Sequence, residues 1–494
     1  MGEIKKQSIQ SSVILGIGVV LGFFLKLYVF PAYLEPSEIG FFTVLIDISN
    51  LCASFIPLGS QLVFMRYLQR FIGNEGKSSS LRKLAYSTTA ISFLVFIVMF
   101  LSSNQWLIDF YSDRAPLLSK YFLVIIPLVF ARALHSLAAA YSKGRKKTVF
   151  PSFIQEILIR FLTLILVVLY GYAILDFDFL VAGYLGVYFV SSLLVFISIK
   201  KLSGWQINWS KTAFSKIELK DILIFGGFSL LTNTGTILIR SIDSIMLTSI
   251  KNLEAAGIYS IAFFIGFLVE IPRRAISQIS FPFLAEAFNK KDFKTIEELY
   301  QKSALNQLIA GSFIFVCLVG SLNELFMIMP NGSIYATAAS VVILIGLAKL
   351  IDTSSGSNSE ILSNSEYFRY NFLSITILAP LGIATNLLLI PKLGLTGAAW
   401  ASLITMFLVN AFRFFIIYWK LKMIPYSLNW LKTLALFIAT LALSYYLPTF
   451  GNPYLSIIIK SLLLGGLILV GAFTLKVSTE LNAVVDSLIK KIRG

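Results

Sequence analysis

The stretch SSVILGIGVVLGFFLKLYVFPAY, residues 11–33, decides the class of the fold. Its interior is apolar apart from one lysine, Lys26. It is long enough to cross a bilayer, because a transmembrane helix needs about 20 predominantly apolar residues. No small-residue cleavage site follows it, so we expect a retained membrane helix and not a signal peptide.

Similar segments follow along the whole chain. Of the 494 residues, 57% are hydrophobic and only 13% are charged. Soluble domains carry about 25% charged residues, so lipid is the better solvent for this surface. We predict an all-α membrane protein with 14 transmembrane helices, at residues 11–33, 38–68, 82–103, 118–142, 148–173, 177–200, 219–248, 254–283, 300–322, 333–356, 366–390, 394–420, 428–449 and 453–476.

The distribution of Lys and Arg predicts the topology. Alternate loops carry basic clusters such as KGRKK at 143–147, whereas the loops between them carry only scattered basic residues. Because Lys and Arg mark cytoplasmic loops, we expect a multi-pass protein with both termini in the cytoplasm. The net charge of +16 is then mainly a topology signal. Nucleic-acid binding is disfavoured, because the basic residues are spread over separate short loops.

The two halves of the chain resemble each other. EPSEIGFF at 35–42 aligns with NLEAAGIY at 252–259 through Gly40 and Gly257, and FLVAGYLG at 179–186 corresponds to LGLTGAAW at 393–400. Parallel repeats of this kind are one way to build an alternating-access transporter with its site between the halves. We predict a six-helix lobe at 1–201, a cytoplasmic linker at 202–218, a second six-helix lobe at 219–422, and two extra helices with a cytoplasmic tail at 423–494.

Charged residues inside the predicted helices mark a candidate site, because a charge at the bilayer centre costs about 2.5–3.5 kcal/mol. The basic ones outnumber the acidic ones: they are Lys26, Arg132, Arg160, Arg240, Arg273, Arg274, Lys349, Arg413 and Lys460, against Asp47, Glu156, Asp243, Glu270 and Asp352. Helical spacing predicts the pairs Glu156 with Arg160, Arg240 with Asp243, Glu270 with Arg273 or Arg274, and Lys349 with Asp352. That such pairs only lock helices together stays an open alternative.

Polar stripes on several helices predict a water-filled cavity. In the segment 219–248, for example, Ser229, Asn233, Thr236, Arg240 and Asp243 recur at three- and four-residue steps and share one face. An excess of guanidinium groups suits a phosphate-bearing substrate. The predicted substrate-binding residues are Arg240, Arg273, Arg274, Lys26, Arg132 and Asn233, and the ion-coupling candidates are Asp47 and Asp243.

The sequence contains no enzyme signature. It lacks a Gly-rich phosphate loop, a zinc helix motif and a nucleophile elbow. The single histidine, His135, and the two cysteines, Cys52 and Cys317, form no metal-binding pattern. We therefore expect no catalytic activity, no cofactor and no metal site.

Three stretches carry a resemblance to a known family. They are LEPSEIGFFTV at 34–44, followed by PLGS at 57–60; EIPRRAISQISFP at 270–282; and NLLLIPKLGLTGAAWASLI at 386–404. Together with the predicted helices and repeat, they resemble the polysaccharide-transporter family of the multidrug/oligosaccharidyl-lipid/polysaccharide exporter superfamily. The resemblance implies two six-helix lobes around a central V-shaped cavity, plus two extra helices.

The resemblance also implies a function. It is that of a flippase in the bacterial cell inner membrane, which moves undecaprenyl-diphosphate-linked oligosaccharide repeat units to the periplasmic leaflet for O-antigen, capsule or exopolysaccharide assembly. The expected partners are this lipid-linked oligosaccharide diphosphate, membrane lipids, and a polysaccharide polymerase with its chain-length machinery. A cation-coupled multidrug exporter, a lipid II flippase, and a membrane polymerase or scaffold remain as alternatives. The excess of basic residues disfavours the drug exporter. The lone Lys26 in the first segment disfavours the lipid II flippase, and the lack of a large outer loop disfavours the polymerase or scaffold.

Overall fold

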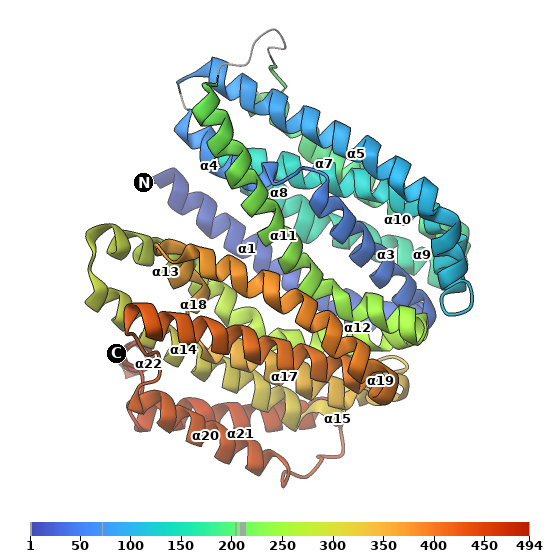
Figure 1. Cartoon of the computed structure of the whole chain (residues 1–494). Coiled ribbons are helices and arrows are strands. Elements are labelled where there is room, and N and C mark those ends of the chain that lie inside the picture. Colours follow the sequence, from blue (N-terminus) through green and yellow to red (C-terminus); the bar gives the residue numbers. More distant parts are fainter. Residues whose placement is uncertain (1, 72, 203–204, 208–213, 494) are drawn as a thin grey trace. The chain divides into compact units, whose positions relative to one another are not determined.

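Residues 2–71, 73–202, 205–207 and 214–493 are described by the structure, a computed structural model of the chain (Figure 1). The middle of the predicted linker 202–218 lies outside these residues. The described part consists of helices and connecting loops, without a strand. The chain divides into two compact units, Met1–Gly257 and Ile258–Gly494, and each is considered by itself.

The first unit is built mainly from long helices. In order these are α1 (Gly2–Phe24), the π-helical turn η1 (Leu25–Val29), α2 (Phe30–Tyr33), α3 (Pro36–Phe55), α4 (Ser60–Arg70), α5 (Glu75–Tyr111), α6 (Pro116–Lys120), η2 (Phe122–Val124), α7 (Ile125–Gly144), α8 (Val149–Phe153), the π-helical turn η3 (Ile154–Leu158), α9 (Ile159–Gly171), α10 (Phe177–Ser198), η4 (Ile199–Leu202) and α11 (Lys216–Ile250). α3 packs against α7 and α11, and α7 packs against α4 and α10.

α12 (Leu253–Phe267) begins in the first unit and continues into the second. The second unit then contains η5 (Leu268–Glu270), α13 (Ile271–Lys290), α14 (Phe293–Gly320), α15 (Leu322–Ile328), α16 (Gly332–Ala336), α17 (Ala339–Ser354), α18 (Asn358–Asn364), α19 (Phe368–Leu421), α20 (Leu428–Ser444), α21 (Pro453–Thr474) and α22 (Thr479–Arg493). α14 is its central helix, because it packs against α13, α17, α20 and α21.

The division into units differs from the predicted repeat boundary. α11, which we predicted to open the second lobe, packs against α3 and α4 and belongs to the first unit. A unit defined by packing and a lobe defined by internal repetition are different divisions of one chain. The predicted parts 1–201, 219–422 and 423–494 therefore stay a prediction.

The helices are long and apolar enough for a multi-pass membrane protein. Among the described residues, 11 helices satisfy length and composition for a membrane span, or 12 if α17 and α18, bent by 46° at their junction, form one span. α19 covers two predicted segments and kinks at Gly394, where φ is 59° and ψ is −130°. α20, with 17 residues, is shorter than a typical span. The predicted number of 14 is thus not confirmed as a count of full spans.

The predicted segment 38–68 is broken into two helices. α3 ends at Phe55 and α4 begins at Ser60, and between them Leu58 and Gly59 have φ angles of 45° and 77°. The sequence PLGS at 57–60 accounts for the break, because proline lacks the backbone N–H that would continue the helix and glycine accepts a left-handed conformation.

Helix starts follow local capping rules. Asn74, Asp176 and Asp292 accept a backbone N–H bond at the starts of α5, α10 and α14, respectively. Outside the membrane, the hydroxyl and backbone N–H of Thr295 hold the pKa of the Asp292 carboxyl below its usual range.

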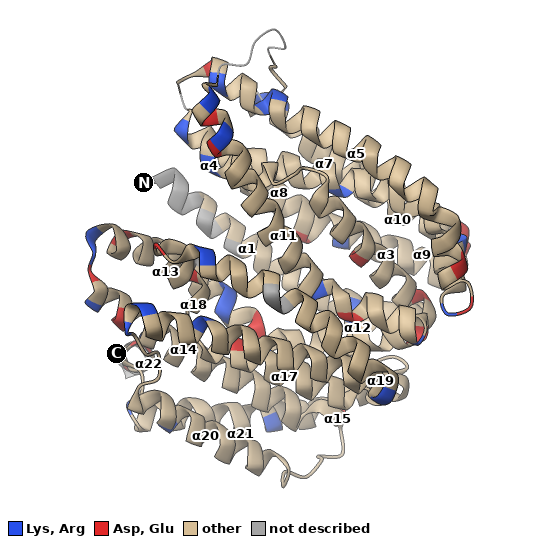
Figure 2. Cartoon of the chain, viewed as in Figure 1, with Lys and Arg blue, Asp and Glu red and all other residues tan. Residues whose placement is uncertain are grey.

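Figure 2 shows the charged residues concentrated at loops and helix ends, with a smaller number within the helices.

Gly40 and Gly257, which the predicted repeat aligns, contact each other. A Cβ atom on Gly40 would lie 1.9 Å from the carbonyl oxygen of Leu253, and one on Gly257 would lie 1.8 Å from that of Pro36. The start of α3 therefore packs backbone against backbone on the start of α12, which only glycine permits.

Candidate functional site

A polar cavity of about 390 Å³ lies in the first unit. Its lining comes from α3, α4, α7, α8, η3 and α11 and includes Asn50, Ser54, Gln61, Arg132, His135, Ser136, Lys143, Gln155, Glu156 and Asn233. The cavity is assembled from distant parts of the sequence because α7 packs against both α3 and α4. Its volume and its convergent polar groups are typical of a small-molecule site.

Arg132, on α7, supplies a cation to this cavity. Its Nε donates to Asn50 Oδ1 at 2.6 Å, and its guanidinium lies 5.3 Å from the centre of the Tyr188 ring. Both partners are neutral. Within the described part of the chain, no carboxylate forms an ion pair with Arg132. The guanidinium keeps further N–H donors for an incoming anion.

His135, Ser136 and Lys143 lie on the same face of α7 as Arg132. His135 is 7% exposed, and its Nδ1 has no hydrogen-bond partner among the described residues. The spacing of three, four and eleven residues from Arg132 is the signal in the sequence that predicts this face. This face is not among the predicted site residues, because His135 was considered only as a metal ligand.

The acidic residue in the lining is already paired. Glu156, on η3, binds Arg160 across one helical turn at 2.8 Å, which confirms the predicted pair. Arg160 also donates to the carbonyl oxygen of Gly18 on α1. Because this pair is neutral as a unit, Arg132 and Lys143 leave the cavity with a positive excess.

Lys26 and Asp47 lie in the first unit but do not line the cavity. Lys26 donates to the Thr43 hydroxyl at 3.5 Å. Asp47, on α3, accepts hydrogen bonds from the hydroxyls of Ser241, at 3.0 Å, and Ser244 on α11. Asp47 thus joins two helices of the first unit, and its ion-coupling role stays a prediction.

The predicted polar face of α11 is not one environment. Asn233 lines the cavity together with Arg132. Arg240 is exposed and Asp243 is buried, and neither of them is part of the lining. The roles predicted for Arg240 in substrate binding and for Asp243 in ion coupling remain predictions.

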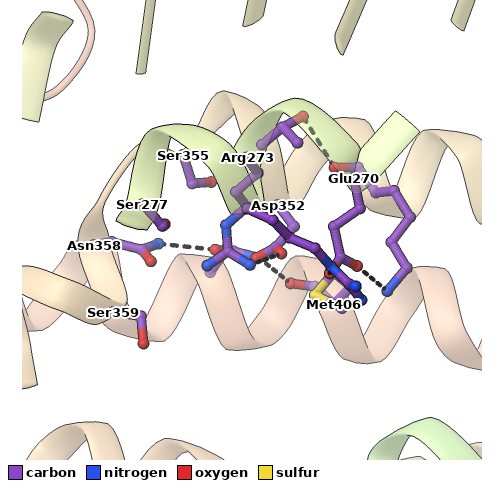
Figure 3. A network of polar contacts seen from close by, with 12 residues as sticks. Glu270, Arg273, Ser277, Asp352, Ser355, Asn358, Ser359 and Met406 are labelled. Atoms are coloured by element: carbon purple, nitrogen blue, oxygen red, sulfur yellow. Dashed lines mark hydrogen bonds and ion pairs between the residues drawn. The ribbon is translucent and has the colours of Figure 1, made fainter. Parts of the chain in front are cut away.

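In the second unit, a network of polar side chains joins α13, α17, α18 and α19 (Figure 3). Arg273 forms an ion pair with Asp352, and the two side chains point toward each other in Figure 3. The Asn410 amide donates to the same carboxylate at 3.0 Å, and the Asn358 amide donates to Asn410 Oδ1 at 2.8 Å. Asn358 and Asn410 are not among the predicted site residues, because no local spacing relates them to Asp352.

Glu270 holds two other cations of this unit. It accepts from Lys349 Nζ at 2.8 Å and from Arg274 Nε at 3.3 Å. Of the two predicted partners of Glu270, Arg274 is thus the one in contact. The predicted pair Lys349 with Asp352 is wrong, because Lys349 reaches Glu270 and Asp352 is bound by Arg273.

The two units therefore present different electrostatics. In the second unit, the candidate substrate residues Arg273 and Arg274 each contact a carboxylate. In the first unit, Arg132 contacts neutral groups. An anion would displace a carboxylate from Arg273 but only an amide from Arg132.

Comparisons with known proteins agree with this architecture. A membrane protein of Methanocaldococcus jannaschii is 20% identical over 470 residues, which cover 92% of each chain. Among solved structures, the lipid II flippase MurJ in an inward closed conformation superposes with a TM-score of 0.72 at 15% identity, over 94% of this chain and 98% of MurJ. An inward-facing multidrug resistance transporter of the MATE family, in the MOP superfamily, superposes with a TM-score of 0.61 at 14% identity, over 84% and 98%.

At these identities, the structural likenesses show the fold alone. The sequence match is more specific, since a family model described as polysaccharide biosynthesis protein matches residues 33–310, more than half of the chain. The expected resemblance to a polysaccharide family is confirmed by this match. The chain belongs to the polysaccharide biosynthesis protein family.

Proposed function

We propose that this protein flips an oligosaccharide linked to undecaprenyl diphosphate, or to a similar polyprenyl diphosphate, across the cytoplasmic membrane. Its product would feed the assembly of O-antigen, capsule or exopolysaccharide. The family match and the transporter fold support a membrane flippase. The observation that carries the proposal is the cationic polar cavity around Arg132.

The cavity suits both parts of such a head group. The diphosphate is doubly anionic, and guanidinium matches phosphate oxygens with paired hydrogen bonds. Asn50, Gln61, Gln155 and Asn233 supply amides that both donate to and accept from sugar hydroxyls. A sugar diphosphate does not cross hydrocarbon unaided, because its charges would lose their hydration, so a polar path through the protein is required.

The mechanism we propose is alternating access. The cavity receives the head group from the cytoplasmic side and releases it outside, while the lipid tail stays in the bilayer. No nucleotide-binding motif occurs in the sequence, so an ion gradient, the membrane potential or consumption of the product drives the cycle. A charge moved through the membrane field contributes about 2.3 kcal/mol per 100 mV, which is enough to bias it.

Lipid II is the second candidate substrate, because MurJ has the same fold. Its head group also carries a diphosphate, so the cavity around Arg132 fits it on the same grounds. A drug exporter for organic cations fits less well, because such a substrate favours an acidic excess. Transport of defined substrates distinguishes the three.

The test uses the purified full chain in proteoliposomes. We expect it to flip a labelled polyprenyl-diphosphate oligosaccharide faster than protein-free vesicles do, and not to flip a labelled phospholipid. Losing one charge-assisted contact costs about 1.5–3 kcal/mol, so Arg132→Gln should weaken head-group binding about ten- to hundredfold, and Arg132→Lys should weaken it less.

The matched control is Arg114→Gln. Arg114 is exposed and donates to the carbonyl oxygen of Ser249, away from the cavity, so binding should stay at the wild-type value. If Arg132→Gln binds the head group as tightly as the wild type does, Arg132 does not contribute to the site. If the protein flips only organic cations, or only lipid II, the proposed substrate is wrong.

A further inference from the structure

A second cavity in the first unit is apolar, with a volume of about 730 Å³. It lies between the end of α3 and the middle of α5, and we call it the α3–α5 groove. Its lining consists of Cys52, Phe55, Ile56, Leu58, Ile91, Ser92, Val95, Phe96, Met99, Phe100, Ser102 and Ser103. At one end of the groove, the hydroxyls of Ser102 and Ser103 donate hydrogen bonds to backbone carbonyls one turn earlier, so they need no other partner.

One wall of the groove is a stripe along α5. Ile91, Val95 and Met99 follow each other at four-residue steps, so they share a face. All three are more than half exposed in the protein alone. Between Ala85 and Tyr111, Phe100 is the one buried residue of α5 among those described. Phe93 and Phe100 pack on Phe130 and Phe122, but the face of α5 with Ile91, Val95 and Met99 is uncovered over several turns and leaves room for a hydrocarbon chain.

α3 separates this groove from the polar cavity. Asn50 and Ser54 line the cavity, whereas Cys52 and Phe55 line the groove. At about 100° per residue, these two pairs point to opposite sides of the helix. The two sites are therefore only one helix apart, with a polar lining on one side of α3 and an apolar lining on the other.

The two sites also lie on either side of the break after α3. Leu58, in the turn, lines the groove, and Gln61, three residues later on α4, lines the cavity. An amphiphile whose polar and apolar parts are covalently joined needs two unlike sites that lie close together. A simple phospholipid acyl chain needs only the groove.

We propose that the α3–α5 groove holds the polyprenyl tail of the substrate, next to the diphosphate link, while the head group occupies the cavity around Arg132. The proposal rests on the proposed function and adds to it a binding site for the lipid part. Recognition of the tail would let the protein select a polyprenyl-linked sugar over a free sugar nucleotide that carries the same diphosphate.

The first experiment places a photoreactive benzophenone side chain at Val95 or at Val98. These residues form a matched pair, because both are exposed valines on α5 and only Val95 lines the groove. The full chain is reconstituted with radiolabelled polyprenyl-diphosphate oligosaccharide and irradiated. We expect labelling at position 95 to exceed that at 98 by about tenfold and to fall when unlabelled substrate is added. Equal labelling at both positions, or labelling unaffected by the competitor, means bulk lipid in the groove and overturns the proposal.

The second experiment separates tail from head group. Val95→Trp fills the groove, and Val98→Trp adds the same side chain facing lipid. We expect Val95→Trp to weaken binding of the long-tailed substrate about tenfold, as overpacking does. Binding of a short-tailed analogue with the same sugar diphosphate should not change. Val98→Trp should leave both affinities unchanged.

The outcomes distinguish the two proposals. If the short-tailed analogue binds and Arg132→Gln abolishes its binding, the head-group site holds. If Val95→Trp then binds the long-tailed substrate as tightly as the wild type does, the proposed tail site in the groove is refuted, and the head-group site is not. If neither substrate binds to the wild-type protein, the proposed function fails, and the tail site fails with it.

Discussion

The ion pair between Arg273 and Asp352 gives the sharpest prediction about the second unit. The Arg273 side chain is 17% exposed and that of Asp352 is 4% exposed. Arg273→Gln removes the cation that contacts the carboxylate. Among the described residues, the buried carboxylate keeps a hydrogen bond from the Asn410 amide and a weaker, longer-range interaction with Arg413. Breaking a buried pair from one side costs about 3–5 kcal/mol, so we expect a loss of that size in the free energy of unfolding.

The assay is equilibrium unfolding of the full chain in detergent, with a double-mutant cycle. Arg273→Gln combined with Asp352→Asn removes both charges, so the double variant should recover most of the stability that either single variant loses. Lys290→Gln is the matched control. It breaks an exposed pair with Glu286 on the same helix and should cost no more than about 1 kcal/mol. An Arg273→Gln protein as stable as this control would refute the reasoning, as would additive losses in the double variant.

The same cycle separates structure from substrate binding. If Arg273 only holds α13 to α17, the double variant should flip substrate at the wild-type rate once it is folded. If Arg273 also contacts the diphosphate, as the sequence predicts, the double variant should fold and fail to flip. The unfolding assay and the flipping assay then give different answers, and the pair of results identifies the role.

Three further predictions concern packing, topology and coupling. Gly40→Ala should cost about 1–3 kcal/mol of unfolding free energy, because its Cβ would meet a carbonyl oxygen at 1.9 Å, whereas Gly186→Ala, which meets nothing within 4 Å, should be tolerated; equal midpoints in thermal unfolding would contradict the contact. In intact cells that express a variant without Cys52 and Cys317, an impermeant thiol reagent should label Ser333→Cys, on α16, and spare Lys294→Cys, in the first turn of α14; the reverse pattern would invert the topology. Asp47→Asn should weaken the response of flipping to an imposed proton or sodium gradient, and an unchanged response would exclude Asp47 from coupling.

Much of the fold is predictable from the sequence, because long apolar segments have few alternatives to helices in lipid. What the hydropathy pattern does not predict is where a helix breaks. The segment 38–68 is continuous in hydropathy, but Pro57 and Gly59 divide it. Near Gly394, by contrast, the sequence does predict the break: the backbone of α19 is non-helical at Gly394, between the predicted segments 366–390 and 394–420.

The ion pairs within single helices show what the spacing of residues in the sequence can predict. Glu156 with Arg160 and Glu270 with Arg274 form as pairs across one turn, and in both the acid precedes the base. This order is the favourable one, because it matches the helix dipole and the direction of side chains along a helix. Lys349 precedes Asp352, and that predicted pair does not form.

Contacts between helices lie beyond such spacing rules. Asp352 meets Arg273 and Asn410, which are 79 and 58 residues away in the sequence. Asn50 meets Arg132 across 82 residues. Charge and polarity in the sequence indicate that these residues need partners in lipid, but only the packing of the helices selects the partner.

The partners of each arginine also indicate which candidate residue should gain most from binding a phosphate. A phosphate that approaches Arg273 must compete with a carboxylate that already holds it, so the gain from the new ion pair is offset by the loss of the old one. A phosphate that approaches Arg132 replaces or joins a neutral amide, and a charge-assisted hydrogen bond is about twice as strong as a neutral one. The net gain is therefore larger at Arg132, although the count of cations in the sequence favours the second half of the chain. For this reason Arg132, and not the Arg273 and Arg274 pair, is the first residue whose substitution should weaken head-group binding.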